Sequence, residues 1–295
     1  MTKCIAFHSY KGGTGKSTIS FNLSAQMVKR GLKVLLLDLD VYAPSLQTYL
    51  DVRPDHWIND FLFEDVKLNH VVTDLTHVVN KYDQVKAKDS EKGKLLVGFS
   101  NGSKDEIYRL EGSVRQDTSM VHLLRKFILI REEISSIYDL DYIVMDTSPG
   151  IRYWSINTLA IVDIILLSLK MDGIDIAGTR VMANEIYKNF SKLGTRSYLL
   201  LNRVAGYCHP PIVTQDSESE SIEKRYTSVI DEQSEDISKL KRDLDMDVIS
   251  TIPCYCDIQF DSKEYLTALQ YPDHPFSLRI NDLIDKLEEL KLSSV

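Results

Sequence analysis

The sequence is poor in cysteine, in long apolar runs and in basic charge. Its 295 residues include four cysteines, too few to staple a small secreted domain, so we expect reduced thiols and a cytoplasmic location. The longest apolar stretch, 159–169, is interrupted by Asp163 and is much shorter than the roughly 20 residues that a membrane span requires. The first residues also lack the basic and apolar pattern of a signal peptide.

Charge and composition exclude several further classes of protein. The net charge of −8 argues against attraction of the whole molecule to nucleic acid or anionic lipid, although a local basic patch for DNA stays open. With 43% hydrophobic and 26% charged residues, the chain resembles an average globular protein and is neither collagen-like nor disordered.

Short apolar runs alternate with segments of helical length along the whole chain. Because these runs are continuous rather than alternating, they predict strands buried on both faces, as in a parallel sheet covered by helices. We therefore predict a single doubly wound α/β domain over 1–295, with a mostly parallel sheet flanked by helices on both faces. The predicted strands are 4–7, 34–37, 95–97, 142–145, 164–169, 198–201 and 248–252, and the predicted helices are 16–30, 115–138, 173–193 and 258–270.

Two polar stretches interrupt this alternation. Residues from about 51 to 93 predict an irregular insertion with a short helix near 59–65. Residues from about 214 to 247 hold eleven acidic and five basic residues, a net charge of −6. Charge runs of this kind are typical of a solvated excursion or exposed helix, and a partner-binding arm is the alternative.

Glycine is scarce, yet three of the 13 glycines stand together between a predicted strand and a predicted helix. Glycines leave backbone N–H groups free to wrap a phosphate, and the start of the following helix adds unpaired N–H groups. Lys16 would then reach the β- and γ-phosphates, and the Ser17 hydroxyl would coordinate Mg²⁺. The predicted nucleotide-binding residues are Gly12, Gly13, Thr14, Gly15, Lys16, Ser17 and Thr18.

This loop resembles the deviant Walker A motif of the ParA/MinD family of ATPases, with Tyr10 at the position of the first glycine of the general pattern. Lys11 matches the signature lysine of that family, which acts across a dimer interface. The resemblance implies a P-loop NTPase fold, MgATP as ligand and an ATP-dependent homodimer. It also implies catalytic roles for Lys11 and Lys16.

Two aspartates follow the second predicted strand. Asp38 and Asp40 stand where parallel sheets bind ligands, and a carboxylate there can hold a Mg²⁺-bound water or orient an attacking water. By spacing alone, a turn after the strand is equally compatible. In the resemblance, Asp40 matches the catalytic residue that positions the hydrolytic water in switch I, and Asp38 matches a residue near Mg²⁺.

The strand 142–145 ends in an acid and a Pro-Gly turn. This segment looks like the Walker B strand and switch II of the same family, with Asp146 binding Mg²⁺ through water and Pro149 and Gly150 in the switch. A buried carboxylate costs free energy unless it is paired or hydrated, and a Mg²⁺ water would offset that cost. An ordinary strand end with a turn is the alternative.

Two later segments resemble the adenine-binding segments of the family. Asn202 offers both a donor and an acceptor to the edge of a base, whereas the assignment of Pro253 rests on the resemblance.

Two further features bear on the cellular role. Cys254 and Cys256 form a C-x-C pair, which predicts packing thiols, with a metal site as the alternative. The final segment has a helical apolar stripe from Ile280 to Leu290 and an acidic polar face, which favours packing on the core over binding to anionic lipid.

The sequence thus predicts a MgATP-hydrolysing switch that partitions or positions DNA or a cellular complex together with an unidentified protein partner. Slow hydrolysis within an ATP-bound dimer is expected, and stable membrane anchoring is not. The alternative is an iron–sulfur or metal-cluster carrier of the same superfamily, because residues 41–46 resemble those carriers.

Overall fold

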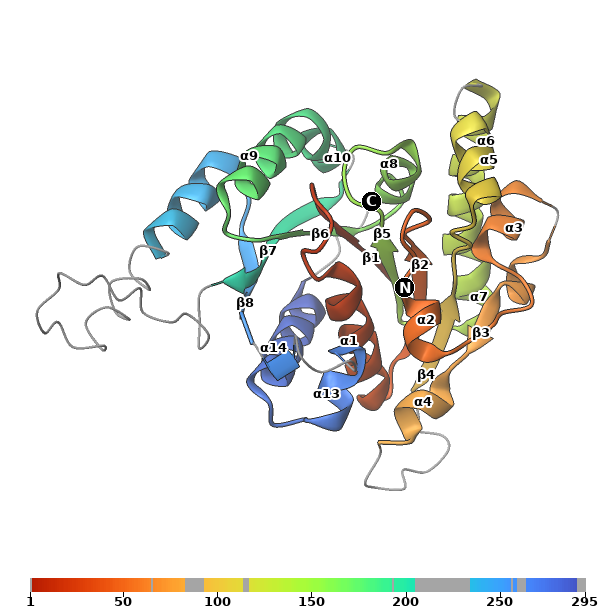
Figure 1. The fold of residues 1–295 in the computed structure, drawn as a ribbon, viewed down its shortest axis with the longest axis horizontal. Coiled ribbons are helices and arrows are strands. Elements are labelled where there is room, and N and C mark those ends of the chain that lie inside the picture. The colour runs from red at the N-terminus through yellow and green to blue at the C-terminus, as the bar shows by residue number, and fades with distance from the viewer. Residues whose placement is uncertain are drawn as a thin grey trace, which may run out of the picture.

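The computed structural model describes residues 2–64, 66–82, 93–113, 117–192, 194–204, 234–255, 257–258 and 264–290. Within these residues one eight-stranded sheet has the order β3-β4-β2-β5-β1-β6-β7-β8 (Figure 1). Only β3 runs antiparallel to its neighbour among these strands. The strands are β1 (Lys3–His8), β2 (Lys33–Leu39), β3 (Val72–Asp74), β4 (Lys94–Gly98), β5 (Tyr142–Thr147), β6 (Ile164–Leu169), β7 (Arg196–Val204) and β8 (Val248–Pro253).

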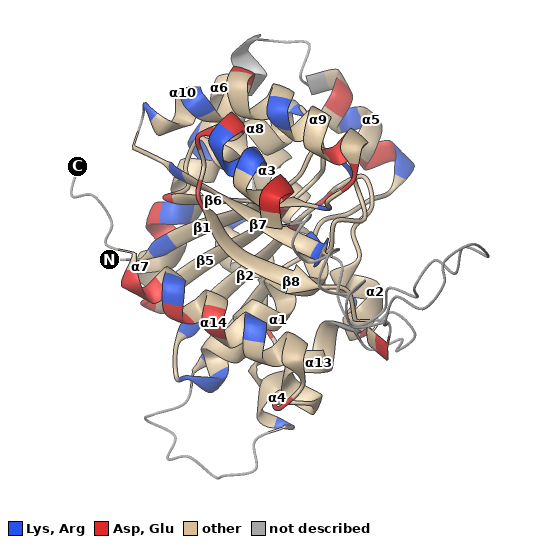
Figure 2. Cartoon of the chain, turned by 90° about the vertical axis from the view of Figure 1, so that its left-hand side faces the viewer, with Lys and Arg blue, Asp and Glu red and all other residues tan. Residues whose placement is uncertain are grey.

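Helices cover both faces of this sheet (Figure 2). The α-helices are α1 (Lys16–Lys29), α2 (Leu46–Leu50), α3 (Ile58–Phe63), α4 (Thr76–Asn80), α5 (Lys104–Ser113), α6 (Asp117–Leu129), α7 (Ser135–Tyr138), α8 (Tyr153–Leu159), α9 (Gly173–Met182), α10 (Lys188–Ser191), α13 (Thr267–Gln270) and α14 (Pro275–Glu289). Short 3₁₀ turns stand at η1 (Leu68–His70) and η5 (Glu264–Leu266), π-helical turns at η3 (Ile130–Ile134) and η4 (Ala183–Tyr187), and a further helix spans 234–244.

Alternate residues of each strand face two separate cores. On β1, Ile5 and Phe7 pack with α1 and α14, whereas Cys4 and Ala6 pack on the side of α6, α8 and α9. A strand with apolar residues at every position is therefore buried on both faces. The predicted doubly wound fold is confirmed, and all seven predicted strands are present.

The two polar stretches are only partly described. The first holds α3, η1, β3 and α4, of which the edge strand β3 was not predicted. In the second, 214–233 lie outside the described residues, whereas 234–244 form a helix that buries Leu240 and Leu244. An ion pair of 2.5 Å joins Asp243 on this helix to Arg180 on α9.

The C-terminal helix α14 packs on the core, as its apolar stripe predicts. Ile280, Leu283, Ile284 and Leu287 are fully buried against the core that contains α1. At the end of the helix, the Lys3 ammonium donates hydrogen bonds to the carbonyls of Leu287, Glu288 and Leu290 at 3.0, 3.2 and 3.0 Å. No helix among the described residues is both long and apolar enough to cross a bilayer.

Candidate nucleotide site

The glycine-rich loop connects β1 to α1 at the carboxyl edge of the parallel strands. Gly13 and Gly15 adopt positive φ angles of 73° and 87°, which other residues adopt at a cost. A Cβ atom on Gly15 would also lie 2.2 Å from Nδ2 of Asn202. Both conformation and space therefore require glycine at position 15.

The first turn of α1 has no side-chain cap. Its leading N–H groups lack helical acceptors, and they stand at the positive end of the helix dipole. This arrangement is suited to an anion such as phosphate.

The loop is braced by the strands that surround it. The Thr14 carbonyl accepts hydrogen bonds from the Ser168 hydroxyl at 3.0 Å and from the Asn202 amide at 2.7 Å. Gly150 donates its N–H to the Ser9 carbonyl at 2.8 Å, which ties the loop to the segment after β5.

Tyr10 explains how the loop departs from the general pattern. A Cβ on Gly178 of α9 would lie 2.1 Å from the Tyr10 ring, so the ring lies directly on this glycine. Tyr10 thus packs outward against α9.

The two lysines of the loop lie in different environments. Lys16 is 6% exposed, and its ammonium donates to the Ser9 hydroxyl at 2.8 Å. The Lys11 side chain is 40% exposed, and its ammonium lies 4.0 Å from the Asp172 carboxylate. The Lys16 side chain is therefore buried inside the loop, whereas the Lys11 side chain is accessible from the surface.

Asp38 and Asp146 are register partners on adjacent strands, and both are buried. Both oxygens of Asp38 accept backbone N–H groups, from Asp40 and Leu46 at 3.2 Å each. Neither oxygen of Asp146 has a hydrogen-bond partner among the described residues. Asp38 therefore holds the segment after β2 in place through two backbone N–H groups, whereas both carboxylate oxygens of Asp146 stay available as acceptors.

The electrostatics agree with this geometry. Burial raises the pKa of Asp146 to about 6, although the Lys16 charge and the Ser17 hydroxyl oppose the shift. Burial and the neighbouring Asp146 raise the pKa of Asp38 well above its usual value. Two buried carboxylates side by side call for a cation, and oxygen ligands with an adjacent hydroxyl suit Mg²⁺.

Asp40 is half-buried and lies where the segments after β2 and β5 meet. Its Oδ1 accepts hydrogen bonds from the Ser148 hydroxyl at 2.9 Å and from the Ala43 N–H at 3.3 Å. Pro149 and Gly150 follow Ser148, and Gly150 has a φ of 79°. The structure thus brings Asp40 and the predicted switch II segment together.

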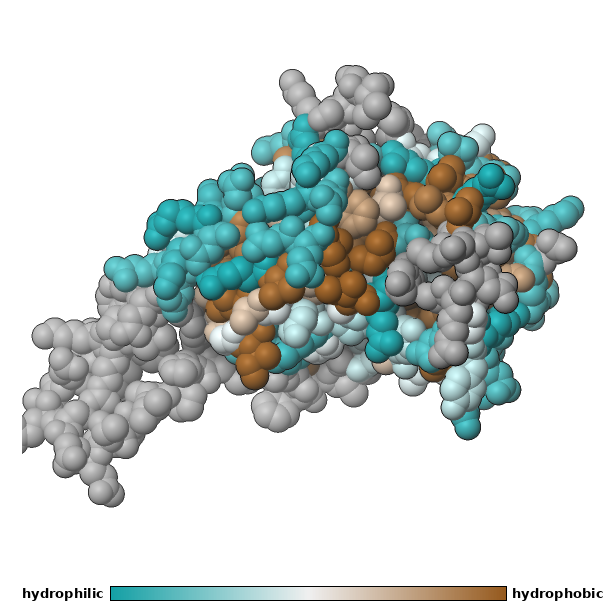
Figure 3. Space-filling view, turned by 90° about the horizontal axis from the view of Figure 1, so that it is seen from above, coloured by the Kyte–Doolittle hydropathy of each residue, from teal (hydrophilic) through white to brown (hydrophobic). Residues whose placement is uncertain are grey.

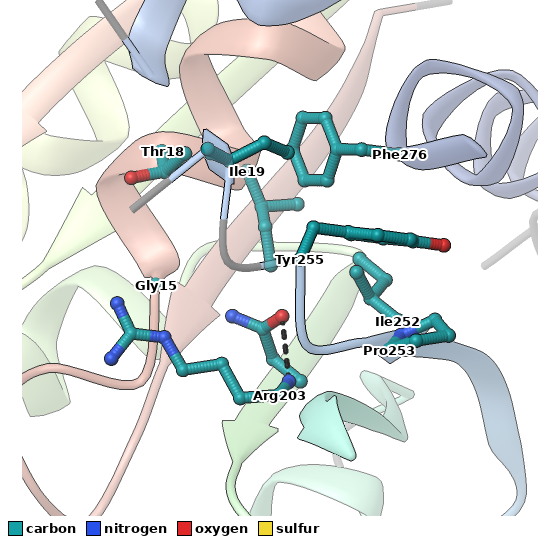
Figure 4. A pocket seen from close by; sticks show the side chains of 10 residues that line it. Gly15, Thr18, Ile19, Arg203, Ile252, Pro253, Tyr255 and Phe276 are labelled. Carbon is teal, nitrogen blue, oxygen red and sulfur yellow. Dashed lines mark hydrogen bonds between the residues drawn. The ribbon is translucent and has the colours of Figure 1, made fainter. Parts of the chain in front are cut away.

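A cavity of about 200 Å³ lies between the start of α1 and the ends of β7 and β8 (Figure 4). Figure 4 shows Arg203 extending toward Gly15, with Tyr255, Phe276 and Ile252 on the other side of the opening. The lining residues are Gly15, Thr18, Ile19, Asn202, Arg203, Ile252, Pro253, Tyr255, Ile258 and Phe276. A slot lined by both apolar and polar groups, next to a phosphate loop, fits a flat heterocyclic base.

Asn202 and Pro253 both line this cavity, as their assignment requires. The Asn202 amide, however, already donates to Thr14 and accepts the Arg203 N–H at 2.9 Å. Arg203 and Tyr255 lie within the two segments predicted to bind adenine, although neither was singled out there. Sequence reasoning missed Phe276, because no local pattern links α14 to the loop.

His8 is a buried polar residue beneath the loop that sequence reasoning also missed. Its Nδ1 lies 2.7 Å from the Thr147 hydroxyl, and that hydroxyl donates to the Phe7 carbonyl at 2.8 Å. Burial and the Lys16 charge lower the pKa of His8 to about 3. The imidazole is therefore neutral at physiological pH.

The C-x-C pair is only half described. Cys254 is partly exposed, and Cys256 lies outside the described residues. No group of three or more His, Cys, Asp or Glu side chains is arranged for a metal ion within the described ranges.

Residues 2–196, about two thirds of the chain, match the family described as AAA domain. The chain belongs to this family. This AAA-domain chain is 32% identical over 167 residues to a cytosolic Fe-S cluster assembly factor NUBP2 homolog of Monosiga brevicollis, covering 56% of this chain and 47% of that protein. It is 31% identical over 150 residues to the flagellum site-determining protein YlxH of Helicobacter pylori, covering 51% and 42%. The AAA-domain chain thus spans about half the length of the curated relatives that it matches.

The fold of this AAA-domain protein is similar to that of the septum site-determining protein MinD of Pyrococcus horikoshii in complex with Mg-ADP. The TM-score is 0.65 at 17% identity, covering 98% of this chain and 97% of that one. The predicted membership of the ParA/MinD family and the predicted P-loop NTPase fold are confirmed. The AAA-domain chain therefore has the P-loop NTPase fold of the ParA/MinD type.

Proposed function

We propose that this protein binds MgATP and hydrolyses it slowly to ADP and phosphate as an ATP-dependent homodimer. The single observation that carries the proposal is the juxtaposition of the Lys16 ammonium with the open acceptors of Asp146 at the mouth of a glycine loop. A buried lysine and an unpartnered carboxylate are together costly unless a phosphate and a cation complete the site.

Each residue has a distinct role in this proposal. Loop N–H groups and Lys16 hold the β- and γ-phosphates, and the cavity beside Asn202 and Pro253 accepts adenine. Ser17 and Asp146 hold Mg²⁺, Asp146 through water, and Asp38 adds its charge. When bound, Mg²⁺ neutralises charge on the phosphate oxygens. Asp40 orients the attacking water.

The dimer is supported by the surface beside the loop. Lys11 is exposed there, so it can reach a nucleotide held by a second copy. Apolar side chains are exposed nearby, with Tyr10 at 38%, Ile151 at 54% and Ile174 at 66%. Figure 3 shows apolar surface gathered between hydrophilic regions on the α8 and α9 side of the molecule. A second copy would cover such a surface.

Lys16→Ala tests the phosphate site, with the exposed Lys67→Ala as a matched control. Titration calorimetry with MgATP is expected to show binding by the wild type and by Lys67→Ala, and none by Lys16→Ala, because charge-assisted hydrogen bonds to several oxygens are lost. Equal affinity in all three proteins would refute the phosphate-loop assignment.

In the cell, we propose a cytoplasmic switch that partitions or positions DNA or a complex with an unidentified protein partner. The similarity to MinD and YlxH, both named for site determination, supports this role. A metal-cluster carrier is the second candidate, favoured by the similarity to the Fe-S cluster assembly factor. Iron and zinc content of freshly purified protein separates the two, because a carrier retains metal through its thiolates.

A further inference from the structure

The segment after β2 (residues 40–45, the switch I segment) contacts the segment after β5 (residues 148–152, the switch II segment). The central contact is the hydrogen bond of 2.9 Å that Ser148 Oγ donates to Oδ1 of Asp40. The Ala43 N–H reaches the same oxygen at 3.3 Å. No described residue donates a hydrogen bond to Oδ2 of Asp40, so this oxygen is open.

Ser148 is itself held in place. The residue is fully buried, and its carbonyl accepts a hydrogen bond of 2.9 Å from the Ser155 hydroxyl on α8. Its own hydroxyl also lies 3.4 Å from the Leu39 carbonyl, but the single proton goes to the nearer, charged carboxylate. Pro149 further restricts the backbone of the residue before it.

Two more contacts fix the switch I segment on either side of Asp40. Trp154, which is buried on α8, donates its indole N–H to the Leu39 carbonyl at 2.9 Å. The guanidinium of Arg152 lies 4.3 Å from the centre of the Tyr42 ring. The switch I segment is therefore held at Leu39 and at the Tyr42 side chain, on either side of Asp40. The Ser148 hydroxyl, which is closer to Oδ1 than the Ala43 N–H is, then fixes the orientation of the carboxylate.

We propose that Ser148 is a positioning residue for ATP hydrolysis, which fixes Asp40 through Oδ1 and leaves Oδ2 to accept a hydrogen bond from the attacking water. This inference rests on the proposed function. The water oxygen forms a bond to the γ-phosphorus while the bond from that phosphorus to the β,γ-bridging oxygen breaks, and the released proton leaves with inorganic phosphate or solvent. A carboxylate free to rotate would hold this water in line for only part of the time.

Ser148→Ala tests the proposal, with Ser24→Ala as the control for loss of a buried hydroxyl, because Ser24 bonds only within α1. We expect kcat to fall about ten-fold or more in Ser148→Ala, with KM and the Kd for MgATP changed less than two-fold. Ser24→Ala should keep the wild-type kcat. Ser148→Cys, which keeps the shape with a weak donor, is expected to lose kcat in the same way and serves if Ser148→Ala does not fold.

The double variant Asp40→Ala/Ser148→Ala decides whether Ser148 acts through Asp40. It should be as slow as Asp40→Ala alone, because the two residues act as a unit. A wild-type kcat in both Ser148 variants overturns the inference, and so does a further ten-fold loss in the double variant. A wild type that binds no MgATP, or that never hydrolyses it, defeats the proposed function instead.

Discussion

Replacing Asp146 by asparagine should stabilise the nucleotide-free protein, although it damages the site. The carboxylate is fully buried without a hydrogen-bond partner, and its pKa is raised from 3.8 to about 6. At about 1.4 kcal/mol per pKa unit, the ionised form costs about 3 kcal/mol of folding free energy at pH 8. Because the asparagine amide is also unpartnered, we expect a gain of about 2 to 3 kcal/mol.

The sign of the pH dependence follows from the raised pKa. Between pH 4 and 6 the folded protein holds a proton on Asp146 that the unfolded chain has lost, so this residue's cost grows as the pH rises through that range. The advantage of Asp146→Asn should therefore shrink to about 1 kcal/mol at pH 4.5.

Thermal unfolding in EDTA without nucleotide measures this effect. A gain of 2 to 3 kcal/mol corresponds to roughly 4 to 6 °C in a chain of this size, and the exposed Asp55→Asn should leave the unfolding temperature unchanged. MgATP should then stabilise the wild type more than the variant. Two results would contradict this reasoning: an Asp146→Asn protein that unfolds at or below the wild-type temperature at pH 8, or one whose unfolding temperature rises as much at pH 4.5 as at pH 8. Either would show that the ionised Asp146 does not destabilise the folded protein.

Two further predictions follow from the loop and the strand beneath it. His8 has a folded pKa of about 3, below its unfolded value, so it contributes stability that is lost as the pH falls below about 6.5. In urea unfolding, His8→Phe should lose about 1 kcal/mol less than the wild type between pH 6.5 and 5.5, and parallel curves would contradict this. Gly15→Ala should weaken MgATP binding at least ten-fold, because its Cβ displaces Asn202. Gly194→Ala is the control, because Gly194 has a φ of 96° but open space around it, and this variant should lose about 1 to 2 kcal/mol of stability without losing affinity for MgATP. Equal MgATP affinities of Gly15→Ala and the wild type would refute the steric argument.

The sheet was predictable because strands that are buried on both faces are continuous apolar runs in the sequence. A strand such as β5 is apolar over Tyr142–Met145, and β1, β2, β4, β6 and β7 also contain continuous apolar runs. The edge strand β3 has only three residues, Val72–Asp74, and none is buried, so no apolar run marks it. The predicted helices 115–138 and 173–193 are interrupted by π-helical turns, which no apolar period announces.

The residues of the site likewise fall into two groups, those that a local sequence motif predicts and those that only the tertiary structure brings together. Residues of the glycine loop were predictable because phosphate binding needs particular residue types at fixed spacing. Partners that come from distant segments were not: Phe276 reaches the cavity from α14, and Arg152 reaches Tyr42 from the neighbouring loop. The closure of Asp38 onto the N–H groups of Asp40 and Leu46 also depends on the path of the chain after β2. Side-chain assignments of this kind emerge only with the tertiary structure.

The hydrogen bond from Asn202 to the Thr14 carbonyl limits how this protein could be redesigned. Asn202 lines the cavity proposed for the base, yet its amide also braces the loop proposed for the phosphates. A change at this position intended to alter base selectivity would loosen the loop at the same time, and the loop would then lose entropy when phosphate orders it. Selectivity is more safely engineered at Phe276, which lines the cavity from α14 rather than from the strands that brace the loop.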